Sequence, residues 1–380
     1  MNKLPPILTC RYFPECSGCE IHGEITPPPV AKELAAFFKE CAALPDFPIA
    51  ISEVKGWRTR AKLAVRGTAE HPLIGLYKRG THEVVAIEDC PLHHPAINKA
   101  IAQLIPLIRS HHILPYDELS HTGKLRYLQF FVERKSRRVQ LTLVVNASSF
   151  DAMLKSLVKQ LYAIGGFHSI WLNFQTDKTN VILGEKWEFC EGEPYLWERV
   201  GSVDCAFHPA CFSQANPALF QTAVERIREW VIPQSHVLEL FSGVGVIGLN
   251  LAHLGCEVTA VEINPYAAEC FELSRLRLPP EVQGRLRMET ASAEKALMHH
   301  QVLVVDPPRK GLTAPLLKAI GEAKELQQIL YLSCGPQSLQ SDLKVLFSQG
   351  WKVEKAEGYL FFPGTNHIET LCSLMRKERA

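Results

Sequence analysis

Apolar strands alternate with helical segments through the second half of the chain, and this alternation restricts the fold more than any other feature. In chain order the strand-like runs are HVLELF, EVTAVEI, RLRME, VLVVDPP, QQILYLS, WKVEKAEGYLFF and HIETLCSLM. Such an alternation predicts an α/β domain with a parallel, doubly wound sheet. Because only a short turn containing Pro and Gly separates the last two runs, we expect those two strands to be antiparallel. We therefore predict a Rossmann-like domain over residues 205–380.

Residues 1–204 show a different pattern. Short strand-like runs, TRAKLAV, PLIGLYK and HEVVAIEDC among them, alternate with turn residues. Helical patterns cover about residues 31–43, 95–110 and 151–165. A basic turn separates LRYLQFFVE from RVQLTLVVN and predicts a hairpin over residues 125–146. We expect this half to be a mixed α+β region.

Composition excludes several classes of protein. The 380 residues include 41 basic and 40 acidic ones, so a nucleic-acid binder driven by overall charge is not expected. Residues 1–10 lack the pattern of a signal peptide, and no run approaches the roughly 18 apolar residues of a membrane span. We expect a cytoplasmic protein without membrane contact, in which the 12 cysteines do not form a disulfide framework.

The segment LELFSGVGVIGL, residues 238–249, predicts a strand, a glycine turn and the start of a helix. Gly243 and Gly245 allow the backbone to approach a ligand closely. The following strand ends at Glu262, where a carboxylate can accept hydrogen bonds from both hydroxyls of a ribose. Nicotinamide and adenosylmethionine cofactors both fit this pattern.

The sequence after a later strand favours adenosylmethionine. Asp306 ends the apolar run VLVVD and is followed by two prolines, which make it a rigid acceptor. Ligands of open α/β sheets gather at the carboxyl ends of the strands. Enzymes that methylate exocyclic amino groups have a similar Asn/Asp-Pro-Pro sequence with an aromatic residue next, whereas Arg309 and Lys310 follow here.

Cys334 follows the run QQILYLS, on the same sheet edge as Asp306. A thiolate there can add to C6 of a uracil, after which C5 can attack the methyl group of the cofactor. A base must then remove the surplus proton from C5. Glu369 in the apolar run IETLCSLM is the first candidate base, and His367 is the second. The alternatives are an ordinary buried cysteine and a glutamate on a solvated strand face.

These motifs resemble the RNA 5-methyluridine (uracil-C5) methyltransferase family over nearly the whole chain. The resemblance is carried by FSQANP at 212–217, FSGVG with Glu262, DPPRKGL, SCGP and HIET. It implies transfer of a methyl group from S-adenosylmethionine to C5 of a specific uridine in RNA, with Cys334 as the nucleophile and Glu369 as the base. The cofactor contacts that it implies are Gln214, Phe241, Gly243, Glu262 and Asp306.

Two residues depart from the pattern of this family, and the position of Cys10 indicates which members the chain resembles most. Gly335 stands where members usually have Asn, and Val246 stands where some carry an Asn that binds the cofactor. Cys10 is too close to Met1 for the N-terminal β-barrel module of some members. The chain therefore resembles the short enzymes that act on one uridine of 23S ribosomal RNA, and a tRNA uridine is the alternative substrate.

Cys10, Cys16 and Cys19 form a C-x5-C-x2-C pattern, and Cys90 precedes a proline. Four thiolates can hold zinc or a [4Fe–4S] cluster, and the spacing alone does not choose between them. The family that the chain resembles carries a [4Fe–4S] cluster on this pattern. We therefore expect these four cysteines to hold such a cluster in a structural role, as an iron–sulfur loop of an RNA-binding α+β region.

A basic run interleaved with an aromatic residue is the first candidate for RNA contact. It contains Lys55, Trp57, Arg58, Arg60 and Lys62. Residues 124–127 are a second candidate, and solvated strand faces are the alternative for both. A monomer suffices, because one chain supplies every group. Methylation of cytosine or of an exocyclic amine, and RNA binding without catalysis, are the competing functions.

Overall fold

The computed structural model describes residues 6–296 and 299–376, and these form two compact units. The first unit comprises the described residues up to Ile25, Glu53–Glu198 and His208–Asn216. The second comprises Thr26–Ser52, Arg199–Phe207 and the described residues from Pro217 onward. The second unit therefore takes an N-terminal segment that precedes most of the first. The division into functional domains at residue 205 stays a prediction.

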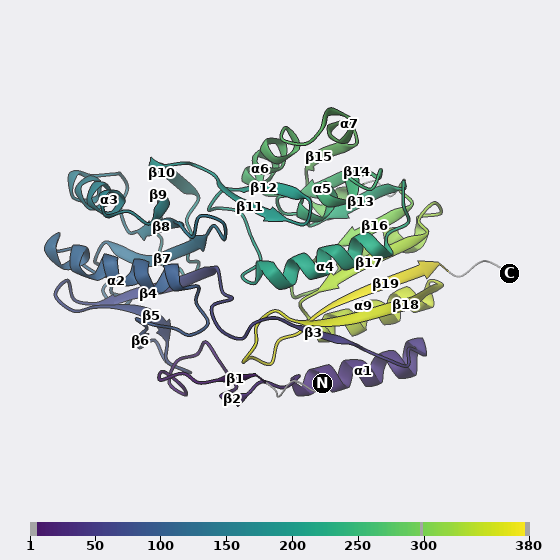
Figure 1. Cartoon of the computed structure of the whole chain (residues 1–380), viewed down its shortest axis with the longest axis horizontal. Coiled ribbons are helices and arrows are strands. Elements are labelled where there is room, and N and C mark those ends of the chain that lie inside the picture. The colour runs from purple at the N-terminus through teal and green to yellow at the C-terminus, as the bar shows by residue number, and fades with distance from the viewer. Residues whose placement is uncertain (1–5, 297–298, 377–380) are drawn as a thin grey trace. The chain divides into compact units, whose positions relative to one another are not determined.

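The first unit contains a seven-stranded sheet among its described residues, in the order β10-β9-β8-β7-β4-β5-β6 (Figure 1). Strands β8 and β9 pair in parallel, and the other neighbours pair antiparallel, as in the hairpin predicted over residues 125–146. The strands are β4 (Arg60–Gly67), β5 (Pro72–Tyr77), β6 (Val84–Ala86), β7 (Leu125–Val132), β8 (Val139–Val145), β9 (Phe167–Phe174) and β10 (Lys186–Gly192).

Two helices pack their apolar faces on one side of this sheet. They are α2 (Pro95–Ser110) and α3 (Ala152–Ile164), close to the predicted ranges. This unit also contains a pair of short strands, β1 (Ile7–Leu8) with β2 (Gly23–Glu24). Another short pair is β11 (Leu196–Val200) with β12 (Val203–Phe207); β12 and the end of β11 belong to the second unit. The expected mixed α+β composition is thus present in the described part of this unit.

The second unit contains the predicted doubly wound sheet, in the order β15-β14-β13-β16-β17-β19-β18-β3. Strands β15 to β17 are parallel, and β19 runs antiparallel between β17 and β18, which confirms the expected orientation of the last two strands. Its strands are β3 (Ile49–Ile51), β13 (His236–Leu240), β14 (Glu257–Glu262), β15 (Leu286–Thr290), β16 (Val302–Val305), β17 (Gln328–Ser333), β18 (Trp351–Leu360) and β19 (Glu369–Arg376).

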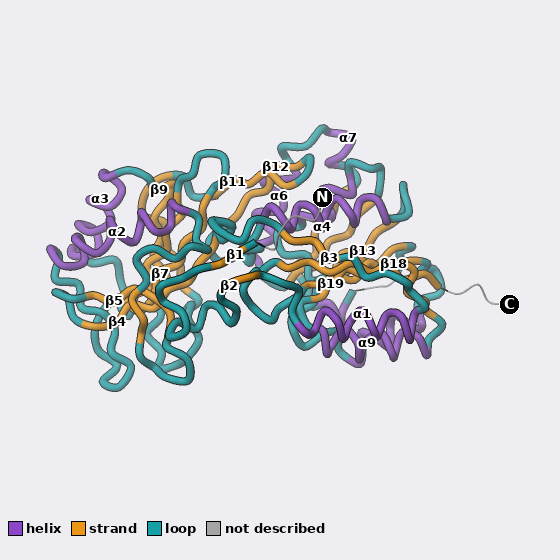
Figure 2. Tube along the Cα trace, turned by 60° about the horizontal axis from the view of Figure 1, so that its bottom comes forward, coloured by secondary structure: helices purple, strands orange, loops and turns teal. Residues whose placement is uncertain are grey.

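Helices cover both faces of this second sheet. Buried residues of α1 (Pro29–Ala42), α8 (Ala314–Glu322) and α9 (Pro336–Ser348) join the strands in one apolar cluster, and Figure 2 shows α1 and α9 side by side. The remaining helical segments of the unit are α4 (Pro217–Trp230), α5 (Val246–Ala252), α6 (Pro265–Arg275), α7 (Pro280–Gln283) and the 3-10 turn η1 (Ala293–Lys295). This arrangement explains why the strands are apolar at nearly every position.

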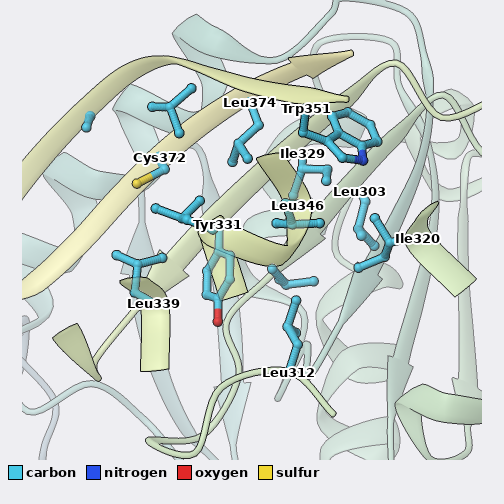
Figure 3. Packing of buried hydrophobic residues seen from close by; sticks show 14 of the residues in the cluster. Leu303, Leu312, Ile320, Ile329, Tyr331, Leu339, Leu346, Trp351, Cys372 and Leu374 are labelled. Atoms are coloured by element: carbon cyan, nitrogen blue, oxygen red, sulfur yellow. The ribbon is translucent and has the colours of Figure 1, made fainter. Parts of the chain in front are cut away.

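Figure 3 shows the packing at the centre of this cluster, where side chains of β17 and β19 meet those of α8 and α9. Ile329, Tyr331, Cys372 and Leu374 are fully buried. Burying a side chain of this size stabilises the fold by about 1.5–3 kcal/mol, which fixes β19 beside β17. No helix among the described residues is long and apolar enough to cross a membrane.

Tyr331 also carries a buried hydrogen bond, since its hydroxyl donates to Asp342 of α9 at 2.7 Å. We predict that Tyr331→Phe lowers the free energy of unfolding by about 1–2 kcal/mol, because the Asp342 carboxyl loses a donor. Urea denaturation measures the loss. Tyr162→Phe is the control, because its hydroxyl makes no hydrogen bond within the described chain; an equal loss in both variants would contradict the assignment.

Candidate active site

The ends of four parallel strands lie at one edge of the second sheet. Leu240 pairs with both Val261 and Val305, and Val305 pairs with Tyr331. The carboxyl ends of β13, β14, β16 and β17 therefore lie next to one another, as do the segments that follow them. They carry the predicted residues Phe241, Gly243, Glu262, Asp306 and Cys334, so the sheet brings these five positions to one rim.

The glycine turn after β13 leaves space on one side and is tightly packed on the other. Gly243 has a φ of +55°, and a Cβ added there would meet nothing within 4 Å. Gly245 has a φ of +77°, and a Cβ there would lie 2.4 Å from Phe271. Gly243 thus faces the open space that a cofactor requires, whereas Gly245 is fixed by packing. Phe241 precedes the turn with a φ of +58°, a conformation that few side chains adopt.

Glu262 holds this turn in place. Its Oε2 accepts the backbone N–H of Gly243 at 3.0 Å, and its Oε1 accepts those of Ile263 at 2.9 Å and Asn264 at 3.0 Å. A carboxylate has about four lone-pair positions, so three protein contacts leave room for about one more. Glu262 can therefore accept a hydrogen bond from a ribose hydroxyl while its other hydrogen bonds hold the loop in place.

Glu239 is a functional candidate that the sequence reasoning missed. It is 2% exposed on β13, and its Oε2 accepts the backbone N–H of Gly248 at 2.9 Å. Burial raises the pKa of Glu239 to about 8, and the negative charges of Asp306 and Glu262 add to the rise. An acidic residue inside the apolar run HVLELF was the available signal, and the same signal identified Glu369.

Cys334 and Glu369 meet across the pair β17 and β19. Ser333 is paired with Thr370, and the two strands are antiparallel, so Cys334, which follows Ser333, lies opposite Glu369, which precedes Thr370. The Cys334 thiol points toward the carbonyl oxygen of Pro307 at 3.9 Å. Burial raises the pKa of this thiol to about 11, as do the charges of Glu369 and Asp306, while Arg309 lowers it.

Glu369 has the environment of a general base. It is 6% exposed, and within the described chain its Oε2 is buried without a hydrogen-bond partner. Burial and the charge of Asp306 raise the pKa of Glu369 to about 8, and Arg309 opposes the rise. Burial also raises the pKa of Asp306 to about 7. His367 is exposed and stands 6.4 Å from the ring of Phe362, so the geometry favours Glu369 over it.

Gln214 belongs to the first unit, and its contact with a cofactor stays a prediction. The four predicted cluster cysteines also lie in this unit. Cys10, Cys16, Cys19 and Cys90 are half-buried and line a single cavity of about 120 Å³. Burial, together with the three other cysteines, raises the pKa of Cys19 to about 12. Among the described residues, no three Cys, His, Asp or Glu side chains form a group that could hold a single metal ion.

Two sets of hydrogen bonds hold the cysteine segments together. The Tyr12 hydroxyl donates to Asp89 at 2.7 Å and accepts the backbone N–H of Glu88 at 3.0 Å. The backbone of Arg58 bonds to Leu92 at 2.9 Å and to His94 at 2.8 Å. The first set fastens the loop that carries three cysteines to the segment that carries Cys90, and the second fastens that segment to the residues before β4.

Two of the arginines expected to contact RNA are buried and bind groups within the protein instead. Arg60 is 9% exposed, and its guanidinium donates to Ser213 at 2.9 Å and to the carbonyl of Pro209 at 3.3 Å. Arg126 is 2% exposed and donates to two carbonyls of the loop that follows β9, each at 2.8 Å. The expectation that these two side chains contact phosphates is therefore wrong, because internal carbonyls already bind them.

The other members of the basic run differ from Arg60. Arg58 lines the cysteine cavity, and Trp57 is buried with its ring 4.9 Å from the Arg58 guanidinium. Lys55 and Lys62 are exposed, and their contact with RNA stays a prediction. The sequence could not separate Arg60 from Lys62, because both lie on the same face of β4 and Arg60 is bound by Pro209 and Ser213, which are distant in the sequence.

Comparison with known proteins agrees with the fold and the site. The family model for tRNA (Uracil-5-)-methyltransferase matches residues 286–377. An uncharacterized RNA methyltransferase of Protochlamydia amoebophila is 40% identical over 375 residues, which is 96% of each chain. The 23S rRNA (uracil(747)-C(5))-methyltransferase RlmC of Shigella boydii is 28% identical and covers 95% of this chain and 97% of its own length.

Among solved structures, the Pyrococcus abyssi tRNA (uracil-54, C5)-methyltransferase superimposes with a TM-score of 0.73 at 23% identity, over 91% of this chain and 83% of its own. The second unit thus has the class I fold of adenosylmethionine-dependent methyltransferases. The chain belongs to the RNA uracil-C5 methyltransferase family, and it is an enzyme that methylates C5 of uracil in RNA.

The raised pKa of Glu369 has a consequence for stability. The folded protein holds this proton up to about pH 8, whereas an unfolded chain releases it near pH 4.5, so stability falls as the pH rises between these values. We predict that Glu369→Gln is the more stable protein at pH 8.5, by about 2–4 kcal/mol, with a smaller difference at pH 5. Denaturant unfolding at both pH values measures this. Glu354→Gln, at an exposed position on β18, is the control; a pH-independent difference for Glu369→Gln would contradict the assignment.

Proposed function

We propose that the protein methylates C5 of one specific uridine in 23S ribosomal RNA, through a covalent adduct between Cys334 and C6 of the uracil. The observation that carries this proposal is the grouping of Cys334, Glu369, Asp306 and Arg309 at the strand ends of the second unit. The match to the Shigella boydii RlmC over 95% of this chain and 97% of its own length favours ribosomal RNA. A tRNA uridine is the alternative, because the family model and the Pyrococcus abyssi enzyme carry that substrate in their names.

The first step is the addition of the Cys334 thiolate to C6. Because the pKa of this thiol is raised to about 11, the proton has to pass to a neighbouring group. Asp306 is the carboxylate that the mechanism leaves available, since Glu369 is needed later. The Arg309 cation favours the thiolate, and the addition places negative charge on the uracil, which turns C5 into a nucleophile.

The second half of the reaction removes a proton. S-adenosylmethionine supplies the methyl group, and the open space beside Gly243 together with Glu262 fits its nucleoside. Once C5 carries the methyl group, it also carries a surplus proton. Glu369 takes this proton through its unpaired Oε2, the C5–C6 double bond re-forms, and the Cys334 thiolate leaves.

We propose further that Cys10, Cys16, Cys19 and Cys90 hold a [4Fe–4S] cluster of structural function. Zinc–sulfur bonds of ~2.3 Å would draw four thiolates around one point, whereas a cluster binds each thiolate to a different iron. All four cysteines line one cavity of about 120 Å³, well above the ~10–15 Å³ that one water requires on the same measure, and this supports the larger group. The Arg58 guanidinium in its wall fits the negative charge of four thiolates.

The methylation proposal is tested by incubation of the protein with labelled S-adenosylmethionine and with separated ribosomal and transfer RNA, followed by nucleoside mapping. We predict 5-methyluridine in 23S RNA, complete loss of product in Cys334→Ala, and a loss of about 10²–10⁴-fold in Glu369→Gln. Glu369→Gln should accumulate the protein–RNA adduct on a denaturing gel, because elimination requires the base. If 5-methyluridine appears in tRNA alone, the substrate is tRNA and not 23S RNA. Normal turnover by Cys334→Ala would refute the mechanism.

The cluster proposal is tested by anaerobic purification. We predict a brown protein with about four irons and four sulfides per chain, because each of the four thiolates binds one iron of the cube. Cys90→Ser should lose the brown colour, and Cys190→Ser should retain it, because Cys190 lies outside this cavity. A colourless wild-type protein that contains one zinc would overturn the proposal.

A further inference from the structure

Two loops of the second unit meet beside Cys334. One follows β16 and carries Asp306 and Arg309, and the other is the short turn from Cys334 to α9. The hydroxyl of Ser338, in the first turn of α9, lies 3.0 Å from the carbonyl oxygen of Arg309 and 2.9 Å from that of Gly335. Its single O–H proton is shared between these two carbonyl oxygens, and this shared hydrogen bond links the two loops directly.

Gly335 makes this link possible. A Cβ added to Gly335 would lie 2.5 Å from the Ser338 hydroxyl and 2.7 Å from the Arg309 carbonyl oxygen, closer than real Cβ contacts. The Arg309 backbone can approach the turn only because residue 335 has no side chain. This contact gives a physical reason for glycine at position 335 of this chain.

The loop after β16 is anchored a second time near its far end. The carboxylate of Asp342 accepts the backbone N–H of Leu312 at 2.8 Å. Arg309 lies between Asp306 and this anchor, and its side chain is exposed. The backbone contact with Ser338 is therefore what fixes the position of Arg309 relative to Cys334.

We propose that Ser338 is a positioning residue for the methyl transfer: its hydroxyl fastens the Arg309 loop to the Cys334 turn and so holds the Arg309 cation beside the thiol. Ser338 contacts neither the uracil nor the cofactor in this proposal, and it acts through Arg309. The inference rests on the role of Cys334 proposed above.

The electrostatics of the thiol agree with this role. Glu369 on β19 and Asp306 after β16 both raise the pKa of Cys334, and Arg309 lowers it. Tyr331, on the strand that leads to Cys334, has a pKa that is itself raised by burial and by its hydrogen bond to Asp342. Arg309 is thus the one cation among these facing groups in the described structure. A shift of its loop therefore changes how strongly positive charge lowers the pKa of Cys334.

The test compares Ser338→Ala with Ser341→Ala, a control one turn further along α9 whose hydroxyl bonds within the helix to Gln337 at 3.0 Å. Alkylation of Cys334, followed by peptide mass mapping from pH 7 to 11, reports the thiolate fraction. We expect the profile of Ser338→Ala to move toward higher pH by about 0.5–1 unit, because Arg309 is less well held. Ser338→Thr should restore the wild-type profile, and Ser341→Ala should retain it.

A second readout uses RNA that contains 5-fluorouridine, in which the adduct cannot lose the C5 substituent. We expect Ser338→Ala to form the adduct about 3–10-fold more slowly at pH 8, in proportion to its thiolate fraction. Gly335→Ala, which crowds the Arg309 carbonyl while it keeps the hydroxyl, should slow it in the same direction. This variant keeps the test open if Ser338→Ala does not fold.

These outcomes distinguish the positioning role of Ser338 from the proposed role of Cys334 as the nucleophile. An alkylation profile of Ser338→Ala that superimposes on the wild type overturns the positioning role, even if the melting temperature falls. If Ser338→Ala shifts the profile but the wild-type protein forms no adduct with 5-fluorouridine RNA, the role of Cys334 as nucleophile fails and the positioning of Arg309 stands.

Discussion

The antiparallel pairing of β19 with β17 is the constraint on which the site depends. Without it, Cys334 would be a thiol at the end of a parallel strand with no base near it. The register that pairs Ser333 with Thr370 places Glu369 against the thiol. Apolar side chains on both strands, Ile329, Cys372 and Leu374 among them, are fully buried and fix that register over several residue pairs. A slip of one residue would turn Glu369 to the other face of the sheet.

The site is also a collection of buried carboxylates, which is costly for a fold. Glu239, Asp306 and Glu369 have pKa values raised to about 8, 7 and 8, so each is stabilised in its neutral form within the folded chain. A cationic sulfonium bound near them would favour their ionised forms. The same arrangement that reduces stability at alkaline pH therefore supplies carboxyl groups that exchange protons near neutral pH.

The sequence predicted the second unit more fully than the first. Largely apolar runs that alternate with helices identify a doubly wound sheet, and strand-end residues of such a sheet converge on one rim, so Gly243, Asp306 and Cys334 could be placed from the sequence. Burial by segments distant in the sequence could not be predicted in the same way: Arg60 looked like an RNA contact but is bound to Ser213. Likewise, the contact of Gly335 with the Arg309 carbonyl joins two loops far apart in the sequence.

The segment of the chain that forms α1 and β3 has a consequence for biosynthesis. These residues are made before most of the first unit, yet β3 pairs with β18 and α1 packs against α9, which are made last. During translation, the apolar side chains of Phe37 and Phe38 therefore lack this packing surface until nearly the whole polypeptide has left the ribosome. A fragment that begins at residue 205 would expose the apolar face that these rings cover, and it would be prone to aggregate.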